Sequence, residues 1–109
     1  MKVKELIQEL SLEILNIEDE NREVEGGYAG DLLSWVMGRA GGGSAWVTIM
    51  TNINIVAVAA LCDTDCVILA ENVEIDQSVI DHAKTQDITI LRSPLGAFEL
   101  CAKISSLIN

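Results

Sequence analysis

The sequence is poor in basic residues. Its 109 residues hold 7 Lys or Arg against 17 Asp or Glu, a net charge of −10. Nucleic-acid binders neutralise phosphates with clustered Lys and Arg, and anionic membrane surfaces attract the same residues. We therefore expect neither nucleic acid nor membrane among the partners of this chain.

Long hydrophobic runs are also missing. The longest, Ile55 to Cys62, is far shorter than the roughly 20 apolar residues of a transmembrane helix. The chain opens with charges, Met1-Lys2-Val3-Lys4-Glu5, and no apolar signal-peptide segment follows. Three cysteines without an export signal are typical of reduced thiols, so we expect a cytoplasmic location.

Phosphate-binding motifs are absent although eight glycines are present. Gly38 and Gly43 have the separation of a Walker loop, but Ser44-Ala45 follow where that loop needs a lysine. No register supplies the dinucleotide pattern of Gly, any residue, Gly, two residues, Gly. We expect the 41–43 glycines to form a flexible turn between a helix and a strand.

The sequence also lacks residues at the spacings that are typical of a catalytic or metal-binding site. The stretch Cys62-Asp63-Thr64-Asp65-Cys66 resembles metal-ligand spacing, but its further ligands would have to be Cys101 and the single histidine, His82. Cys66 starts an apolar run and Cys101 stands beside Leu100, so both are better explained as core thiols. No serine or cysteine is tied to His82 by spacing. We expect no metal, no cofactor and no enzymatic activity.

Apolar residues are abundant. They make up 50% of the chain, and the mean hydropathy is +0.33. A domain this small buries only about two-thirds of its unfolded surface, so part of this material is expected in a subunit interface. We predict one domain, 1–109, that forms a homodimer. The interface candidates are Trp35, Met37 and Trp46, the tryptophans being alternatively core residues.

Hydrophobic periodicity predicts an α/β fold. Apolar residues recur at helical spacing from Val3 to Leu15, which predicts a helix. An acidic turn to residue 21 and a short strand at 22–25 are expected next. Strands then alternate with helices through 22–109. This alternation predicts βαβ units: about four mainly parallel strands with helices on both faces, plus an N-terminal helix. Expected helices are 30–37, 53–61, 77–85 and 94–107; expected strands are 45–50, 66–69 and 88–91.

Ligands of such sheets bind beyond the carboxyl ends of the strands. We expect Gly26–Gly30 to be a tight turn at that edge, or alternatively a backbone nest for an anion. Arg92 either binds an anion or forms a salt bridge with Glu71 or Asp31. The candidate ligand-binding residues at this edge are Gly27, Tyr28, Gly30, Asp31, Thr51, Asn52, Glu71, Asn72, Arg92 and Ser93.

The order of these features resembles the DRTGG domain family. The resemblance covers about Val24 to Ile104, and its most telling pieces are GYAGDLL at 27–33 and the segment from Pro94 to Phe98. The family's Asp-Arg and Thr-Gly-Gly are replaced here by Asn52-Ile53 and Ala70-Glu71-Asn72, so the chain looks like a divergent, stand-alone member.

Domains of this family are similar to the N-terminal domain of HPr kinase/phosphorylase and also occur beside CBS domains. The resemblance implies a non-catalytic regulatory module, commonly dimeric, that acts with a partner protein. The alternative is a sensor that binds an adenine nucleotide or another small anion at the strand ends. These two expectations differ in whether the strand-end surface holds a protein or a small ligand.

Overall fold

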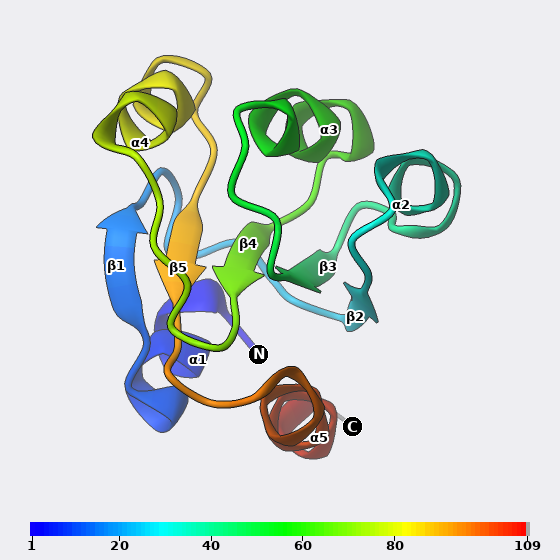
Figure 1. Ribbon diagram of the computed structural model, residues 1–109. Helices are drawn as coiled ribbons and strands as arrows, with labels where there is room; N and C mark the ends of the chain where they lie inside the picture. The colour runs from blue at the N-terminus through cyan, green and yellow to red at the C-terminus, as the bar shows by residue number, and fades with distance from the viewer. Residues whose placement is uncertain (109) are drawn as a thin grey trace.

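The computed structural model, which describes residues 1–108, contains one five-stranded sheet with the order β1-β5-β4-β3-β2 (Figure 1). The strands β2, β3, β4 and β5 run parallel to one another, and β1 pairs antiparallel with β5. The predicted mainly parallel α/β class is confirmed, with an additional antiparallel strand. The strands are β1 (Glu13–Asn16), β2 (Gly26–Ala29), β3 (Ser44–Thr48), β4 (Cys66–Leu69) and β5 (Ile90–Arg92).

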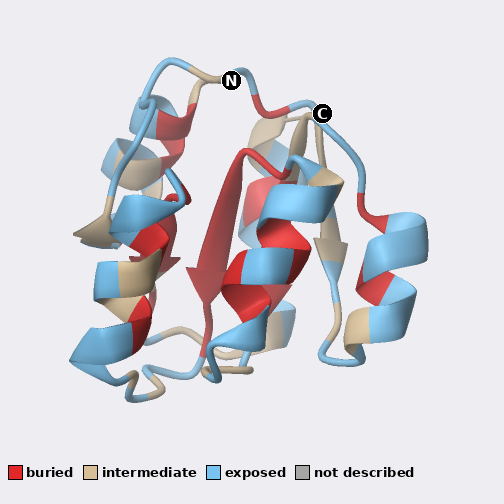
Figure 2. Cartoon of the chain, turned by 90° about the horizontal axis from the view of Figure 1, so that it is seen from above, coloured by how far each residue is buried: buried red, intermediate tan, exposed pale blue. Residues whose placement is uncertain are grey.

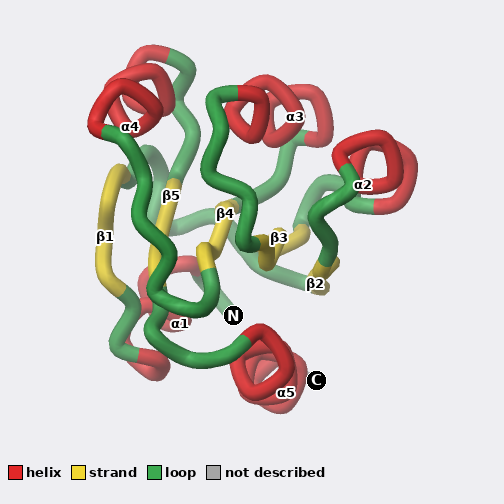
Figure 3. Tube along the Cα trace, viewed as in Figure 1, coloured by secondary structure: helices red, strands yellow, loops and turns green. Residues whose placement is uncertain are grey.

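Helices cover both faces of this sheet, as predicted. The first face carries α2 (Leu33–Arg39), α3 (Asn54–Cys62) and α4 (Gln77–Thr85); the second carries α1 (Val3–Leu10) and α5 (Ala97–Ile108) (Figure 3). Side chains alternate along each strand, so Trp46 packs beneath the first group and Val47 beneath the second. Figure 2 shows the consequence: β4 is buried, and the helices turn exposed faces outward. None of the helices in the described part of the chain is long and apolar enough to cross a membrane.

The N-terminal helix is shorter than predicted. It ends at Leu10, because Ser11 adopts a left-handed conformation with φ 52°, and the chain then extends as β1. Ile14 therefore lies in a strand and is 49% exposed, although its spacing from Leu10 fits a helix. Pairing with β5 gives this segment its backbone hydrogen bonds, and that partner lies more than 70 residues away in the sequence. Residues 1–21 thus contribute a strand to the sheet and not only a helix and a turn.

The glycine-rich stretch is a strand and not a loop. We predicted a strand at 22–25 followed by a turn at 26–30, but the strand is β2, paired with β3 in the register Tyr28 to Trp46. Of the predicted strand, the structure retains an isolated bridge between Lys2 and Glu23. The prediction of a turn at 41–43 is confirmed, since these residues join α2 to β3 and Gly43 has φ +79°.

The last helix also begins later than predicted. Ser93 and Pro94 form a turn, in which the Ser93 hydroxyl oxygen accepts a hydrogen bond from the N–H of Leu95 at 3.1 Å. The helix α5 starts at Ala97, three residues after the proline. By contrast, the predicted bounds of β4 and α4 agree with the structure.

Candidate functional site

The carboxyl ends of the parallel strands enclose an open groove of about 290 Å³. Its walls come from the ends of β2 and β3, the second residue after β4 and the first turn of α5. This is the edge at which the sequence placed a ligand site. The residues of the groove that matter below are Gly30, Asp31, Thr48, Ile49, Glu71 and Ala97.

The two carboxylates in the groove already accept hydrogen bonds from the chain. Oδ1 of Asp31 accepts one from the Thr48 hydroxyl at 2.7 Å and one from the Ile49 N–H at 3.0 Å. Oε2 of Glu71 accepts one from the N–H of Ala97 at 3.1 Å. A helix N-terminus attracts negative charge, and at α5 the carboxylate of Glu71 holds that position.

Arg92 lies at this edge but is paired elsewhere. Its guanidinium donates to both carboxylate oxygens of Glu13, at 3.0 and 2.9 Å, and to the Val73 carbonyl at 3.1 Å. The hydrogen bond from Arg92 lowers the pKa of Glu13. The predicted alternatives of Glu71 or Asp31 as ion-pair partner are therefore wrong. The sequence prediction missed Glu13 because it placed this residue in a helix.

Three more predicted ligand residues, Asn52, Asn72 and Ser93, make hydrogen bonds within the loops that follow the strands. Oδ1 of Asn52 accepts the N–H of Asn54, next to Thr51 in the loop that leads into α3. Ser93 is fully buried, and its carbonyl accepts the N–H of Asn72 at 2.9 Å. These contacts stabilise the loops that follow β3, β4 and β5.

Gly27 and Tyr28 lie within β2, on opposite faces of the sheet. The Tyr28 ring packs against the first core and against Gly30, where an added Cβ would lie 3.0 Å from the ring. Gly27 faces the second core, beside α5. From this part of the chain, Ala29, Gly30 and Asp31 line the groove at the strand ends, and Gly27 and Tyr28 do not.

The predicted interface residues fall into two groups. Trp35 and Met37 lie on α2 and are 52% and 49% exposed. Trp46 is fully buried, and its indole N–H donates to the Gly30 carbonyl at 2.9 Å. Trp46 is therefore a core residue, and its prediction as an interface residue is wrong.

Four exposed apolar side chains lie at strand ends or helix starts, and the sequence prediction missed them; Ile49 lines the groove, and Leu32 and Phe98 are next in the chain to its residues Asp31 and Ala97. They follow strand ends or begin helices, at Leu32, Ile49, Ile53 and Phe98, and Phe98 is 89% exposed. The sequence contains one indication of these exposed apolar residues, because Ile49 directly follows a buried strand, where a loop usually has polar residues. These four side chains are called the apolar rim below.

The cysteines are free thiols. Burial raises the pKa of Cys66 to about 12, so this thiol stays protonated. Across residues 1–108, no three His, Cys, Asp or Glu side chains are arranged to hold a metal ion. His82 is half-buried on α4.

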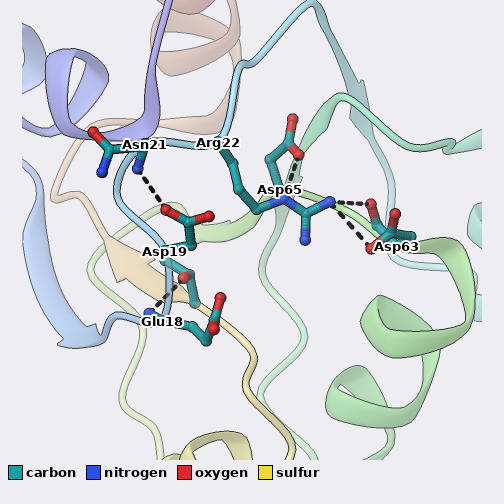
Figure 4. Close-up of polar contacts among 7 residues, drawn as sticks. Glu18, Asp19, Asn21, Arg22, Asp63 and Asp65 are labelled. Carbon is teal, nitrogen blue, oxygen red and sulfur yellow. Dashed lines mark hydrogen bonds and ion pairs between the residues drawn. The ribbon is translucent and has the colours of Figure 1, made fainter.

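A second charged cluster lies at the opposite edge of the sheet (Figure 4). Nε of Arg22 donates to Oδ1 of Asp65 at 2.8 Å, and Nη2 donates to Oδ1 of Asp63 at 3.1 Å. Burial raises the pKa of Asp65, while Arg22 lowers it. Through these ion pairs, Arg22 links the acidic 17–25 segment to the turn that precedes β4.

No family model matches the chain, and no curated protein matches it significantly. A solved structure is similar in fold: the CBS and DRTGG domains of the regulatory region of a Clostridium perfringens pyrophosphatase, in complex with its activator diadenosine tetraphosphate. The TM-score is 0.71 at 17% identity, over 98% of this chain.

The chain has a DRTGG-like fold. It spans 45% of the length of the pyrophosphatase chain, so the similarity concerns one part of that regulatory region. At 17% sequence identity, this similarity shows that the two proteins share a fold and shows nothing further. The resemblance drawn from the sequence is thereby supported for the architecture.

Proposed function

We propose that this DRTGG-like domain is a non-catalytic regulatory module that acts by binding a partner protein through the strand-end edge. The apolar rim carries the proposal, above all Phe98, which is 89% exposed in the first turn of α5, next in the chain to the groove residue Ala97. Clustered apolar side chains rimmed by polar groups are typical of protein-binding surfaces. The similar pyrophosphatase structure is itself a regulatory region and is consistent with this role.

The alternative, a sensor of an adenine nucleotide or another small anion, has less support in the geometry. The groove is lined by two charged side chains, Asp31 and Glu71, and both are carboxylates. The nearby Arg92 is paired with Glu13, and Glu71 already holds the N-terminus of α5. A polyphosphate in this groove would meet two like charges and would have to displace existing hydrogen bonds.

The cytoplasmic location remains part of the proposal. Cys62, Cys66 and Cys101 are free thiols, which is consistent with a reducing compartment. Regulation of a cytoplasmic partner also fits the absence of any recognisable catalytic set in the sequence.

The experiment compares three forms of the chain as bait in the source cell extract: wild type, Phe98→Ser and Leu61→Ser. Leu61 is a matched control, because it is 77% exposed but lies at the end of α3, away from the groove. We expect wild type and Leu61→Ser to retain the same discrete protein and Phe98→Ser to lose it. Equal capture by all three forms would contradict the assignment to the apolar rim.

A thermal-shift panel separates the alternative function. A ligand that binds only the folded state raises the melting temperature, by about 2.7 kcal/mol of stability at 100 times its Kd. We expect ATP and diadenosine tetraphosphate to leave the melting temperature unchanged. A saturable shift that disappears in Arg92→Ala would favour the nucleotide sensor and overturn the proposal.

A further inference from the structure

The edge strand β2 has no neighbouring strand on its outer side among the described residues (Figure 1). The N–H groups of Gly26 and Gly30 donate to the neighbouring β3 segment, both at 3.1 Å. In a parallel pair every second residue bonds to the same neighbour, so the N–H and C=O groups of Gly27 and Ala29 point away from the sheet. Both residues are exposed, so these backbone groups are open to another chain.

This edge lacks the usual protection against pairing. Natural edge strands carry Lys, Pro, bulges or inward charges that prevent another strand from adding. The sequence of β2 is Gly-Gly-Tyr-Ala, with none of these devices, and its pairing with β3 is regular. Such a strand offers backbone donors and acceptors to an incoming extended segment.

A groove of about 320 Å³ runs beside β2, between the sheet and α5. Its strand side includes Gly27, Ala29 and Ala45, whose small side chains leave the space beneath the helix unfilled. Its helix side includes Ile104 and Ile108, and no residue that lines the groove is charged. Residues opposite each other on neighbouring strands share a face of the sheet. A segment paired with β2 would therefore place alternate side chains over this groove, and apolar side chains suit it.

Carboxylates flank β2 at both ends. Glu25 directly precedes the strand and Asp31 is the second residue after it, and both are exposed. They are six residues apart, about 20 Å of extended chain. An incoming strand thus meets an uncharged centre between two acidic ends, on a domain of net charge −10. This pattern attracts Lys or Arg at both ends of the segment, whereas a second copy of the chain would bring its own carboxylates to the same places.

We propose that β2 binds an extended segment of another protein, which adds to the sheet as an antiparallel strand. The segment carries apolar side chains at two alternate positions, opposite Gly27 and Ala29, and Lys or Arg at both ends. Each of the two apolar residues exchanges both N–H···O=C bonds with β2, so four hydrogen bonds form. Antiparallel pairing is the more stable arrangement per residue, and β1 already shows it at the opposite edge of the sheet.

The first test is binding of a synthetic peptide to the purified chain, measured by fluorescence anisotropy. The probe is fluorescein-labelled Lys-Thr-Val-Thr-Val-Thr-Lys, in which the valines occupy the two alternate positions and suit an extended strand. The control peptide has Glu in place of both Lys. We expect saturable binding of the Lys peptide that weakens with added salt, and binding of the Glu peptide that is at least ~10-fold weaker at low ionic strength.

Two N-methylated peptides test the backbone bonds and the register without altering the protein. N-methylation of a valine removes an N–H that bonds to β2, whereas N-methylation of the central threonine removes one that points away from β2. We expect the first peptide to bind at least ~5-fold more weakly, which is the effect of about one hydrogen bond. The second should bind as tightly as the parent peptide.

A protein variant locates the site on the edge strand. Ala29→Pro removes an outward N–H that β3 does not use, and edge strands tolerate proline at such a position. We expect Ala29→Pro to bind the Lys peptide at least ~5-fold more weakly than wild type, and the matched control Ala29→Ser to bind like wild type. Circular dichroism checks that both variants are folded.

Several outcomes would overturn the proposal. They are no saturable binding of the Lys peptide up to about 1 mM, equal binding of the Glu peptide, a larger loss from methylating the threonine than the valine, or a folded Ala29→Pro that binds like wild type. The proposal does not rest on the apolar rim, which is tested by protein capture with Phe98→Ser. Failure of one proposal therefore leaves the other in place.

Discussion

Replacing Arg22 with alanine removes the counter-ion of a buried carboxylate. Asp65 has a side chain only 3% exposed, and Arg22 is its ion-pair partner, while Asp63 on the same arginine is 76% exposed. The second oxygen of Asp65, Oδ2, is buried without a hydrogen-bond partner among the described residues. In Arg22→Ala the charge of Asp65 is therefore left buried and unpaired.

The expected loss of stability follows from this burial. Removing one partner of a fully buried pair costs roughly 3–5 kcal/mol. Arg22 is itself 29% exposed, so water reaches part of the space that it leaves, and we expect about half of that cost, ~2 kcal/mol. For a domain of this size, ~2 kcal/mol lowers the melting temperature by about 8–16 °C.

The loss depends on pH with a defined sign. The pKa of Asp65 in the folded chain is raised by burial, and removing Arg22 raises this pKa further. A carboxyl whose pKa is higher in the folded than in the unfolded state stabilises the fold when it is protonated, and this stability is lost as the pH rises through the folded-state pKa. The destabilisation by Arg22→Ala should therefore be full at pH 7 and shrink as the pH falls towards 5, still above the pI of 4.2.

The assay is urea unfolding followed by circular dichroism at pH 7 and pH 5. Arg92→Ala is the matched control, because Arg92 also pairs with a carboxylate through Nε and an Nη atom, but its partner Glu13 is 53% exposed. We expect a clearly smaller loss for Arg92→Ala, since exposed ion pairs contribute little. Equal losses for both variants at pH 7, or a larger loss for Arg22→Ala at pH 5, would refute the reasoning.

Two further predictions concern local geometry. Glu71→Ala removes the hydrogen bond to the N–H of Ala97 at the start of α5, and we expect the free energy of unfolding in urea to fall by about 1 kcal/mol. The control is Asp76→Ala, which should be less destabilising because the Asp76 side chain makes no capping hydrogen bond on α4. A larger loss for Asp76→Ala than for Glu71→Ala would refute the capping role of Glu71. Gly43→Ala should lower the free energy of unfolding by about 1 kcal/mol, because Gly43 has φ +79° and an added Cβ would lie 3.2 Å from a carboxylate oxygen of Glu25. The control Gly41→Ala has open space around the added Cβ and should be neutral or stabilising in the same assay.

Several elements could be predicted from local sequence because their signal is local. The buried strand Cys66–Leu69 is a continuous apolar run, and the helix Gln77–Thr85 follows Asp76, a residue type favoured at helix N-caps although its side chain makes no capping hydrogen bond in this structure. Alternation of such elements is enough to indicate parallel βαβ units. The net charge and the missing motifs likewise needed no structure.

The candidate site was less predictable because its side chains depend on distant partners. Arg92 was recognised as a charged residue at a strand end, but its pairing with Glu13 depends on β1 lying beside β5. Ile14 and Ile17 have helical spacing, and only the hydrogen bonds offered by β5 make this segment a strand. Glu71 reaches Ala97 because two loops meet at the same sheet edge.

The sequence by itself thus determined the class of fold, the acidic charge and the approximate location of β3, β4, β5 and the helices, since composition and periodicity act within a few residues. The tertiary structure alone decided that Gly26–Ala29 is an open edge strand, that Trp46 is buried and that Arg92 is already paired. Each of these depends on which segments lie side by side. Strand pairing and burial are set by contacts across the whole chain, and no local pattern of residues encodes them.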